Sequence, residues 1–189
     1  AVVLGLGRDA QFIAVGGGVV CDITAFAASI YMRGVSLILI PTTLLSMVDA
    51  ALGGKTGVDF KSYKNLVGSF YPAEEVRIYT LFTDTLSTHE YFNGLAEVIK
   101  HSLLTGGEFF AKITKRKKEI LSRNPDMIEE LVYESLLIKK QYVEDDPFEK
   151  NGLRAQLNFG HTFGHAYETI TGLENVSHGE AVAWGISRA

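Results

Sequence analysis

The sequence predicts an α/β domain with a Rossmann-like parallel sheet, followed by an all-helical domain. In the first half, short apolar runs alternate with segments that can form helices, as in sheets with crossover helices. After Thr83 the apolar runs stop and amphipathic helical patterns follow. We place the boundary between 82 and 88, so that residues 1–85 form the first domain and residues 86–189 the second.

Glycine and proline delimit the elements of the first half. One apolar run stops at Gly16-Gly17-Gly18 and another ends at Pro41. Three glycines within five residues, at 53–57, break regular structure and predict a loop. The expected elements are strands at 11–15, 35–40 and 76–79 and helices at 19–31 and 42–52.

Capping and breaking residues delimit the helices of the second half. Ser87 or Thr88 can cap a helix that has Glu90 in its first turn. The basic cluster at 115–118 is interpreted as a solvated helix face, because charge runs usually lie on the surface. The expected helices are 88–104, 108–122, 126–144, 163–171 and 180–188.

Composition narrows the class of protein. The 189 residues are 47% hydrophobic and 21% charged, as in globular proteins, and the net charge of −4 disfavours general nucleic-acid binding. No apolar run reaches the roughly 18 residues of a membrane span. The single cysteine, Cys21, favours a reducing compartment such as the cytoplasm. Because the chain begins at Ala1 rather than Met, we expect it to be a piece of a longer protein.

Two glycine-rich segments are candidate anion sites. The cluster Gly16-Gly17-Gly18 lies between a strand and a helix, where a backbone can approach a pyrophosphate, although a tight turn explains it equally well. Gly54-Lys55 resembles the end of a P-loop, but that motif requires a glycine where Asp49 stands. Lys55 therefore remains either a cation for an anionic substrate or an exposed lysine.

Histidines and a carboxylate indicate a metal or catalytic site. His161 and His165 share one helix face at spacing i, i+4, and His178 follows before another predicted helix. Glu97 and Lys100 lie in an otherwise apolar helix, where they form either a helical salt bridge or a metal ligand beside a substrate-binding lysine. The other histidines, His89 and His101, are interpreted as structural, and Cys21 as a packed small residue.

The motifs as an ordered set resemble the 3-dehydroquinate synthase family almost from end to end. Each motif is only moderately specific by itself, but their common order along the chain is highly specific. The first-domain motifs are the Gly16–Asp22 cluster, Tyr31-Met32-Arg33-Gly34, Pro41-Thr42-Thr43, Gly53-Gly54-Lys55-Thr56-Gly57 and Lys64-Asn65-Leu66. The second-domain motifs are Ala96-Glu97-Val98-Ile99-Lys100, Asn158-Phe159-Gly160-His161 with His165, and His178-Gly179-Glu180.

The resemblance implies a cyclase of the shikimate pathway, a carbon–oxygen lyase. Family members convert 3-deoxy-D-arabino-heptulosonate 7-phosphate to 3-dehydroquinate and phosphate with NAD+, which is regenerated in each turnover. It also implies zinc, with cobalt as the alternative, held by Glu97, His161 and His178, and a catalytic rather than ligating His165. Full-length members are expected to be homodimers.

The resemblance assigns further site residues by position. The residues expected to contact the substrate are Arg33, Asp49, Lys55, Asn65, Lys100, Lys139, Glu149, Arg154 and Asn158. The residues expected to line the NAD site are Gly16, Gly17, Gly18, Asp22, Thr42, Thr43, Lys64, Phe82, Thr85 and Asn93.

This sequence departs from the family pattern at several positions. Cys21 and Ala25 stand where the family usually has glycine, which could tighten the cofactor turn. Asn151 resembles a single insertion, so Glu149 rather than Lys150 is taken as the family glutamate. The same shift selects Lys139, with Lys140 as the alternative, and family members extend beyond both ends of this chain.

Other functions remain open from the sequence. A related sugar-phosphate cyclase that makes an inosose or a valiolone would share the metal and NAD layout. A metal-dependent polyol dehydrogenase fits less well, because Lys55, Lys64 and Lys100 suit an acidic phosphorylated substrate. An inactive fragment that keeps the fold is the third alternative.

Overall fold

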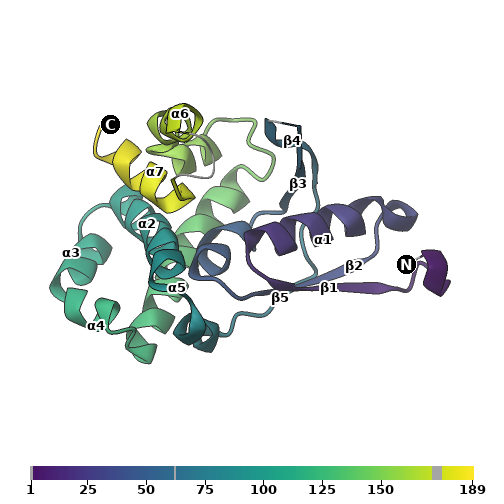
Figure 1. Ribbon diagram of the computed structural model, residues 1–189, viewed down its shortest axis with the longest axis horizontal. Helices are drawn as coiled ribbons and strands as arrows, with labels where there is room; N and C mark the ends of the chain where they lie inside the picture. Colours follow the sequence, from purple (N-terminus) through teal and green to yellow (C-terminus); the bar gives the residue numbers. More distant parts are fainter. Residues whose placement is uncertain (1, 62, 172–175) are drawn as a thin grey trace.

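A computed structural model of the chain describes residues 2–61, 63–171 and 176–189. Three parallel strands form the first sheet in the order β1 (Gln11–Gly16), β2 (Ser36–Pro41) and β5 (Glu75–Val76). Helix α1 (Gly18–Ile30) lies over one face of this sheet (Figure 1). The predicted parallel α/β fold is therefore confirmed, although the last strand is shorter than the expected 76–79.

An antiparallel hairpin stands where the sequence predicts only a loop. Strand β3 (Lys55–Phe60) pairs with β4 (Tyr63–Phe70) and forms a second sheet beside α1 (Figure 1). Of the glycines at 53–57, only Gly53 and Gly54 have the positive φ angles of a loop. Gly57 pairs with Gly68 across the hairpin. A Cβ on Gly68 would lie 2.0 Å from the backbone oxygen of Thr56, so glycine at this position permits close pairing of the strands.

The segment that connects the two sheets is helical but irregular. The predicted helix 42–52 is observed as a short helical turn with a π-helical part, η3 (Ser46–Ala50). Its start is held by Thr43 and Ser46, whose side-chain oxygens lie 2.8 Å apart. Met47 and Val48 pack into the helical core, while Asp49 lines a cleft. The turn thus joins the core of the second half to the edge of the sheet.

Caps explain the long helices of the second half. After the 3-10 turn η4 (Thr80–Thr85), Ser87 caps α2 (Thr88–Thr105) by accepting a hydrogen bond from the Glu90 N–H at 3.1 Å. Asn124 caps α5 (Pro125–Asp145) in the same way. The final helices are α6 (His161–Thr171) and α7 (His178–Ile186), each beginning two residues earlier than expected.

The predicted helix 108–122 is divided in two. Helix α3 (Glu108–Lys115) ends before Arg116 and α4 (Lys117–Leu121) begins after it. The Arg116 guanidinium donates hydrogen bonds to Glu119 and Glu130. The three lysines of the basic cluster are exposed as expected, but Arg116 is half-buried in these ion pairs.

Two apolar cores correspond to the two kinds of structure. The larger core lies among α2, α3, α4 and α5, and the smaller one between α1 and the parallel sheet. Cys21 belongs to the smaller core, and burial raises the pKa of its thiol to about 11, which agrees with a packing role. Within the described residues, no helix is both long and apolar enough to cross a membrane.

Candidate functional site

A cleft of about 470 Å³ lies between the hairpin, η3 and the helical half. Its wall is rich in charge, with cations from β3, α2, α5 and the 3-10 turn η5 (Arg154–Asn158). The expected site residues that line it are Asp22, Asp49, Lys55, Lys100, Lys139, Arg154, Asn158 and His161. The fold therefore brings together residues that lie up to about 140 positions apart in the sequence.

Glu97 is a fully buried carboxylate on α2. Lys100, one turn further on and equally buried, forms an ion pair with its Oε2 atom. Burial alone would raise the pKa of Glu97, but the contacts with His178 and Lys100 outweigh burial and hold this pKa at about 2. Glu97 is therefore ionised at neutral pH, as a metal ligand must be.

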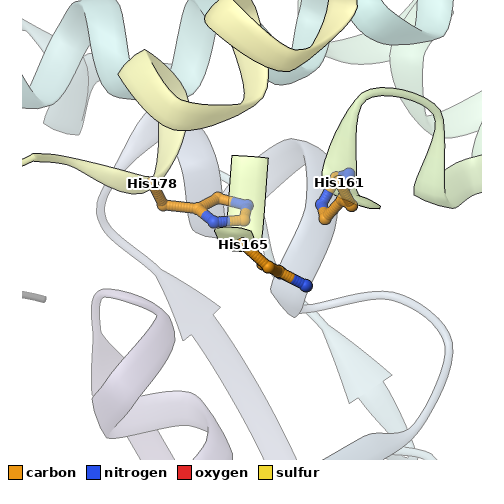
Figure 2. A group of neighbouring side chains, drawn as sticks. All are labelled: His161, His165 and His178. Atoms are coloured by element: carbon orange, nitrogen blue, oxygen red, sulfur yellow. The ribbon is translucent and has the colours of Figure 1, made fainter. Parts of the chain in front are cut away.

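Three histidines, His161 and His165 from α6 and His178 from α7, gather in one place (Figure 2). The Nε2 atoms of His161 and His178 lie 3.8 Å and 3.5 Å from Glu97 Oε1. Burial lowers the pKa of His161, whereas at His178 the contact with Glu97 outweighs burial and raises the pKa. His165 lies 5.4 Å from His161 between ring centroids and is exposed.

These residues suit a divalent metal ion. Both Glu97 oxygens are buried and lack a well-aligned hydrogen bond among the described residues, although Lys100 lies in ion-pair contact. Two imidazoles and one carboxylate form a ligand set that zinc accepts, with positions left for water or substrate. His161, His165 and His178 also present ring nitrogens within 4.8 Å of one another, so distance alone does not distinguish ligands from a catalytic histidine.

Asp49 and Lys139 form a second ion pair in the cleft wall, in which only Lys139 is buried. Lys139 Nζ lies 2.5 Å from Asp49 Oδ1 and also donates to the Asp49 backbone oxygen. Burial opposes ionisation of Asp49, but Lys139 and Lys100 outweigh burial and lower its pKa. Of the two alternatives from the sequence, Lys139 faces the cleft, whereas Lys140 pairs with Glu144 at an exposed position.

The rim of the cleft joins the hairpin to the segment before α6. Lys55 forms an ion pair with Glu149, and Glu149 Oε1 accepts a hydrogen bond of 3.1 Å from Asn158. The buried Arg154 guanidinium donates to the backbone oxygens of Gly53 and Pro147. Arg154 is thus held by neutral groups, and its charge can act on an anion in the cleft.

The glycine turn lies at the carboxyl edge of the parallel sheet. Gly16 ends β1 beside Pro41 of β2, and the Thr42 N–H donates to Gly16 O at 2.8 Å. A Cβ on Gly17 would lie 3.1 Å from Thr43, so the turn and Thr43 are neighbours. Burial and the nearby Asp49 raise the pKa of Asp22 to about 6. In open parallel sheets this edge is where ligands bind.

Several expected site residues do not line the cleft or already hydrogen-bond to other parts of the chain. Arg33 follows α1 with φ 70° and is not among the described residues that line the cleft. Asn93 accepts a hydrogen bond of 2.5 Å from Gly179 N–H, which fastens α7 to α2. Phe82 and Thr85 lie on η4. The side chains of Lys64 and Asn65 lie outside the described residues.

Sequence reasoning missed two residues of the site. His101 is interpreted above as merely structural, but it is fully buried within 4.8 Å of Asp49 and Glu97, counted between possible ligand atoms. Glu168 is buried with Oε1 3.7 Å from His178 Nδ1. Helical spacing was the available signal, because His101 is i+4 from Glu97 and Glu168 is i+7 from His161.

Family models match the whole of the described chain. The N-terminal model of 3-dehydroquinate synthase matches residues 2–93, and the C-terminal model matches residues 94–189. The chain belongs to the 3-dehydroquinate synthase family. A 3-dehydroquinate synthase of Dictyoglomus turgidum is 51% identical over 95% of this chain, and one of Acidithiobacillus ferrooxidans is 48% identical over 98%. The chain spans about half, 50%, of the length of each of these relatives.

Solved structures support the same family fold. A 2-epi-5-epi-valiolone synthase from Streptomyces hygroscopicus, with NAD+ and Zn2+ bound, matches with TM-score 0.87 and 31% identity, over 98% of this chain and 52% of its own. A 2-deoxy-scyllo-inosose synthase complexed with carbaglucose-6-phosphate, NAD+ and Co2+ matches with TM-score 0.85 and 28% identity, over 98% and 51%. The cleft of this 3-dehydroquinate synthase family member thus lies within a fold common to sugar-phosphate cyclases.

Proposed function

We propose that this chain is the central part of an enzyme that converts 3-deoxy-D-arabino-heptulosonate 7-phosphate to 3-dehydroquinate and phosphate. The observation that carries this proposal is the convergence of Glu97, His161 and His178 beside a cleft lined with cations. Relatives with this name are 48–51% identical to the chain. Because the chain spans only half of each relative, the activity is a proposal for the longer protein.

In this proposal Glu97, His161 and His178 hold a divalent metal ion, zinc or cobalt. The cyclase structures with NAD+ and either Zn2+ or Co2+ support this choice of cofactors. When bound, the metal would supply Lewis acidity to a substrate hydroxyl, and NAD+ would supply a transient hydride acceptor. The residues of the chain orient the substrate, exclude water and move protons around these groups.

The cations of the cleft would bind the two anionic ends of the substrate. Lys55 lies half-exposed on the rim and Arg154 lies below it, both within reach of a phosphate or carboxylate in the cleft. Lys100, Lys139 and Asp49 form the inner wall, where ordered charges orient hydroxyl groups. We assign Arg33, Lys64, Asn65, Glu149 and Asn158 as further substrate or cofactor contacts from family position.

His165 would move protons in this proposal rather than bind the metal. Its ring lies beside both proposed ligand histidines, and the residue is exposed to solvent. An imidazole in contact with solvent is a common general acid and base in enzymes. The structure therefore supports a division between two partly buried histidines that bind and one exposed histidine that transfers protons.

We assign NAD+ to the carboxyl edge of the parallel sheet. The glycine turn before α1 and the threonines after β2 meet at this edge, as a pyrophosphate site requires. The proposed lining residues are Gly16, Gly17, Gly18, Asp22, Thr42, Thr43, Lys64, Phe82, Thr85 and Asn93. We retain residues 1–85 and 86–189 as the proposed cofactor and metal domains, a homodimer as the proposed assembly, and the cytoplasm as the proposed compartment.

One assay tests the function. The heptulosonate phosphate is offered to the chain with NAD+ and zinc, and phosphate and dehydroquinate are both followed. Equal release of the two products is expected from a competent chain, whereas phosphate without dehydroquinate would contradict the proposal. Turnover of a sedoheptulose phosphate instead would favour an inosose or valiolone cyclase, a second candidate supported by the matched cyclase structures.

The assay also separates an inactive fragment from a wrong assignment. Zinc content is measured on the same sample, before substrate is added. A chain that retains zinc but turns over no substrate keeps the proposed metal site without a complete catalytic site. A chain that retains no zinc and turns over no substrate is an inactive fragment.

A further inference from the structure

The two proposed ligand histidines present the same ring atom to Glu97. His161 Nε2 lies 3.8 Å from Glu97 Oε1, and His178 Nε2 lies 3.5 Å from the same oxygen. A neutral imidazole carries one proton on one of its two nitrogens. To offer the Nε2 lone pair to a metal at this point, each ring must carry its proton on Nδ1.

Each of these rings has an acceptor on its Nδ1 side. For His161 it is the Phe159 backbone oxygen, 3.3 Å away. For His178 it is the Glu168 carboxylate, whose Oε1 lies 3.7 Å from Nδ1. Glu168 is buried on α6, so its charge acts on the ring with little screening by water. The two rings thus have different acceptors, but both acceptors favour a proton on Nδ1 and leave Nε2 free.

We infer that Glu168 is a positioning residue that holds His178 as the Nδ1–H tautomer, with Nε2 directed to the metal site. This inference rests on the metal site proposed above. A contact of 3.7 Å is an ion-pair distance rather than a formed hydrogen bond. Hydrogen bonds of functional sites are often long in unliganded proteins and shorten when the ligand is bound. A carboxylate in this place also makes the imidazole a stronger ligand.

His165 provides an internal contrast. Its ring centroid lies 5.4 Å from that of His161 and 6.4 Å from that of His178, so all three rings share one environment. Among the described residues, however, no acceptor faces either ring nitrogen of His165. Without such an acceptor both tautomers are accessible, which suits proton transfer. The presence of an Nδ1 acceptor therefore distinguishes the two ligands from the catalytic histidine, which distances between the rings do not.

The test reads the Nδ1 proton and the metal affinity separately. The zinc-loaded, 15N-labelled chain is examined by long-range 1H–15N NMR, which detects the Nδ1 proton of each ligand imidazole and its rate of exchange with water. Zinc dissociation constants are measured by competition with a chromophoric chelator. The variants are Glu168→Gln and Glu168→Ala, and Glu129→Gln is the control because it removes one exposed negative charge from α5.

We expect the Nδ1 proton of His178 to exchange slowly with water in the zinc-loaded unmodified chain and in the control, because Glu168 accepts it. Glu168→Ala should weaken zinc binding about 10- to 100-fold, the usual effect of removing such a partner, and Glu168→Gln should fall between. In both variants the His178 Nδ1 proton should exchange faster with water, while exchange of the His161 Nδ1 proton should stay unchanged because its acceptor is a backbone oxygen.

Other outcomes overturn the inference. An unchanged exchange rate of the His178 Nδ1 proton, or a zinc dissociation constant within twofold of the unmodified chain in Glu168→Gln, would show that Glu168 does not position the ring. If Glu168→Ala does not fold by circular dichroism, Glu168→Gln decides the question. If the unmodified chain binds no zinc, the proposed metal site fails and this inference fails with it. If the chain binds zinc and Glu168→Gln changes neither measurement, only the inference fails.

Discussion

The candidate metal centre and the candidate dinucleotide turn are built in opposite ways. Glu97 and Lys100 are buried, and each has an oppositely charged partner within the helical half. The turn at Gly16–Gly18 is only half-buried, and the first residue after it, Val19, is 73% exposed. The metal centre is therefore buried and stabilised by ion pairs, whereas the glycine turn is exposed and its shape is set by the backbone.

This difference suggests that zinc binding depends on this chain alone, whereas NAD+ binding depends on further groups. The metal centre takes all its proposed ligands from residues 97–178, within the helical half. Apolar side chains near the turn, including Ile13, Val15 and Ile23, are about half exposed, and clustered exposed apolar groups mark surfaces that meet other groups. We therefore expect this chain to bind zinc through its own residues, and to bind NAD+ more weakly than zinc.

The largest expected effect comes from a substitution in the buried metal centre. Glu97→Ala should abolish zinc binding, because it removes the carboxylate that both ligand histidines face. It should also lower the free energy of unfolding by about 3–5 kcal/mol, since Lys100 would stay buried without its partner. Zinc content after gel filtration and urea unfolding measure the two effects. Glu129→Ala is the control, and stoichiometric zinc in Glu97→Ala would refute the ligand assignment.

The second ion pair of the cleft should be asymmetric. Asp49→Asn leaves Lys139, which is 7% exposed, without a counter-charge, and should cost about 3 kcal/mol of unfolding free energy. Lys139→Met leaves Asp49, which is 32% exposed and can be reached by water, so its cost should be smaller. Urea unfolding of both variants checks the order. A larger loss in Lys139→Met would mean that packing of the lysine, rather than its charge, governs this pair.

Two glycine substitutions compare the regions directly. A Cβ on Gly179 would lie 2.3 Å from the Asn93 backbone oxygen, so Gly179→Ala must displace α7 and should cost about 1–3 kcal/mol. A Cβ on Gly17 would lie 3.1 Å from a Thr43 methyl group, which can move, and Gly17→Ala should cost less than about 1 kcal/mol. Thermal unfolding measures both.

Zinc affinity sharpens the same comparison. Because Gly179 follows His178, displacement of α7 should also weaken zinc binding in Gly179→Ala, whereas Gly17→Ala should leave it unchanged. Equal effects of the two alanines on zinc affinity would show that the regions are coupled rather than separate.

The smallest effect is a pH dependence of the metal-free chain. Burial and the nearby Lys100 lower the pKa of His101 from 6.5 to about 4, so the unfolded state takes up this proton first as pH falls. The stability is thus complete above pH 6.5 and decreases between pH 6.5 and 4. A later loss follows between pH 4.5 and about 2, where Glu97 is protonated.

A substitution isolates the histidine contribution. With a chelator present, His101→Gln should flatten the loss of stability between pH 6.5 and 4 and leave the later loss in place. His178 acts with the opposite sign, because its raised pKa gives stability that decreases as pH rises, but this contribution is common to both proteins. An unchanged slope in His101→Gln would show that the buried imidazole does not control this range.

Local signals predicted most of the architecture. The glycines after β1, Pro41 at the end of β2 and the caps Ser87 and Asn124 act within a few residues, so the sequence displays them directly. The hairpin was not predicted, because glycine is a poor strand former and the pairing of Gly57 with Gly68 depends on two distant segments meeting. The division at Arg116 likewise depends on Glu130, fourteen residues later on α5.

The same distinction applies to the site. Residue types, helical spacing and family resemblance determined Glu97, His161, His165 and His178 as candidates from the sequence alone, together with the cofactors to expect. Only the tertiary structure decided that His101 is buried beside Asp49 and Glu97, that Lys139 rather than Lys140 faces the cleft, and that Glu168 faces His178. The physical reason is that burial and the distance between charged groups set their pKa values and ring orientations, and both arise only when separate helices pack together.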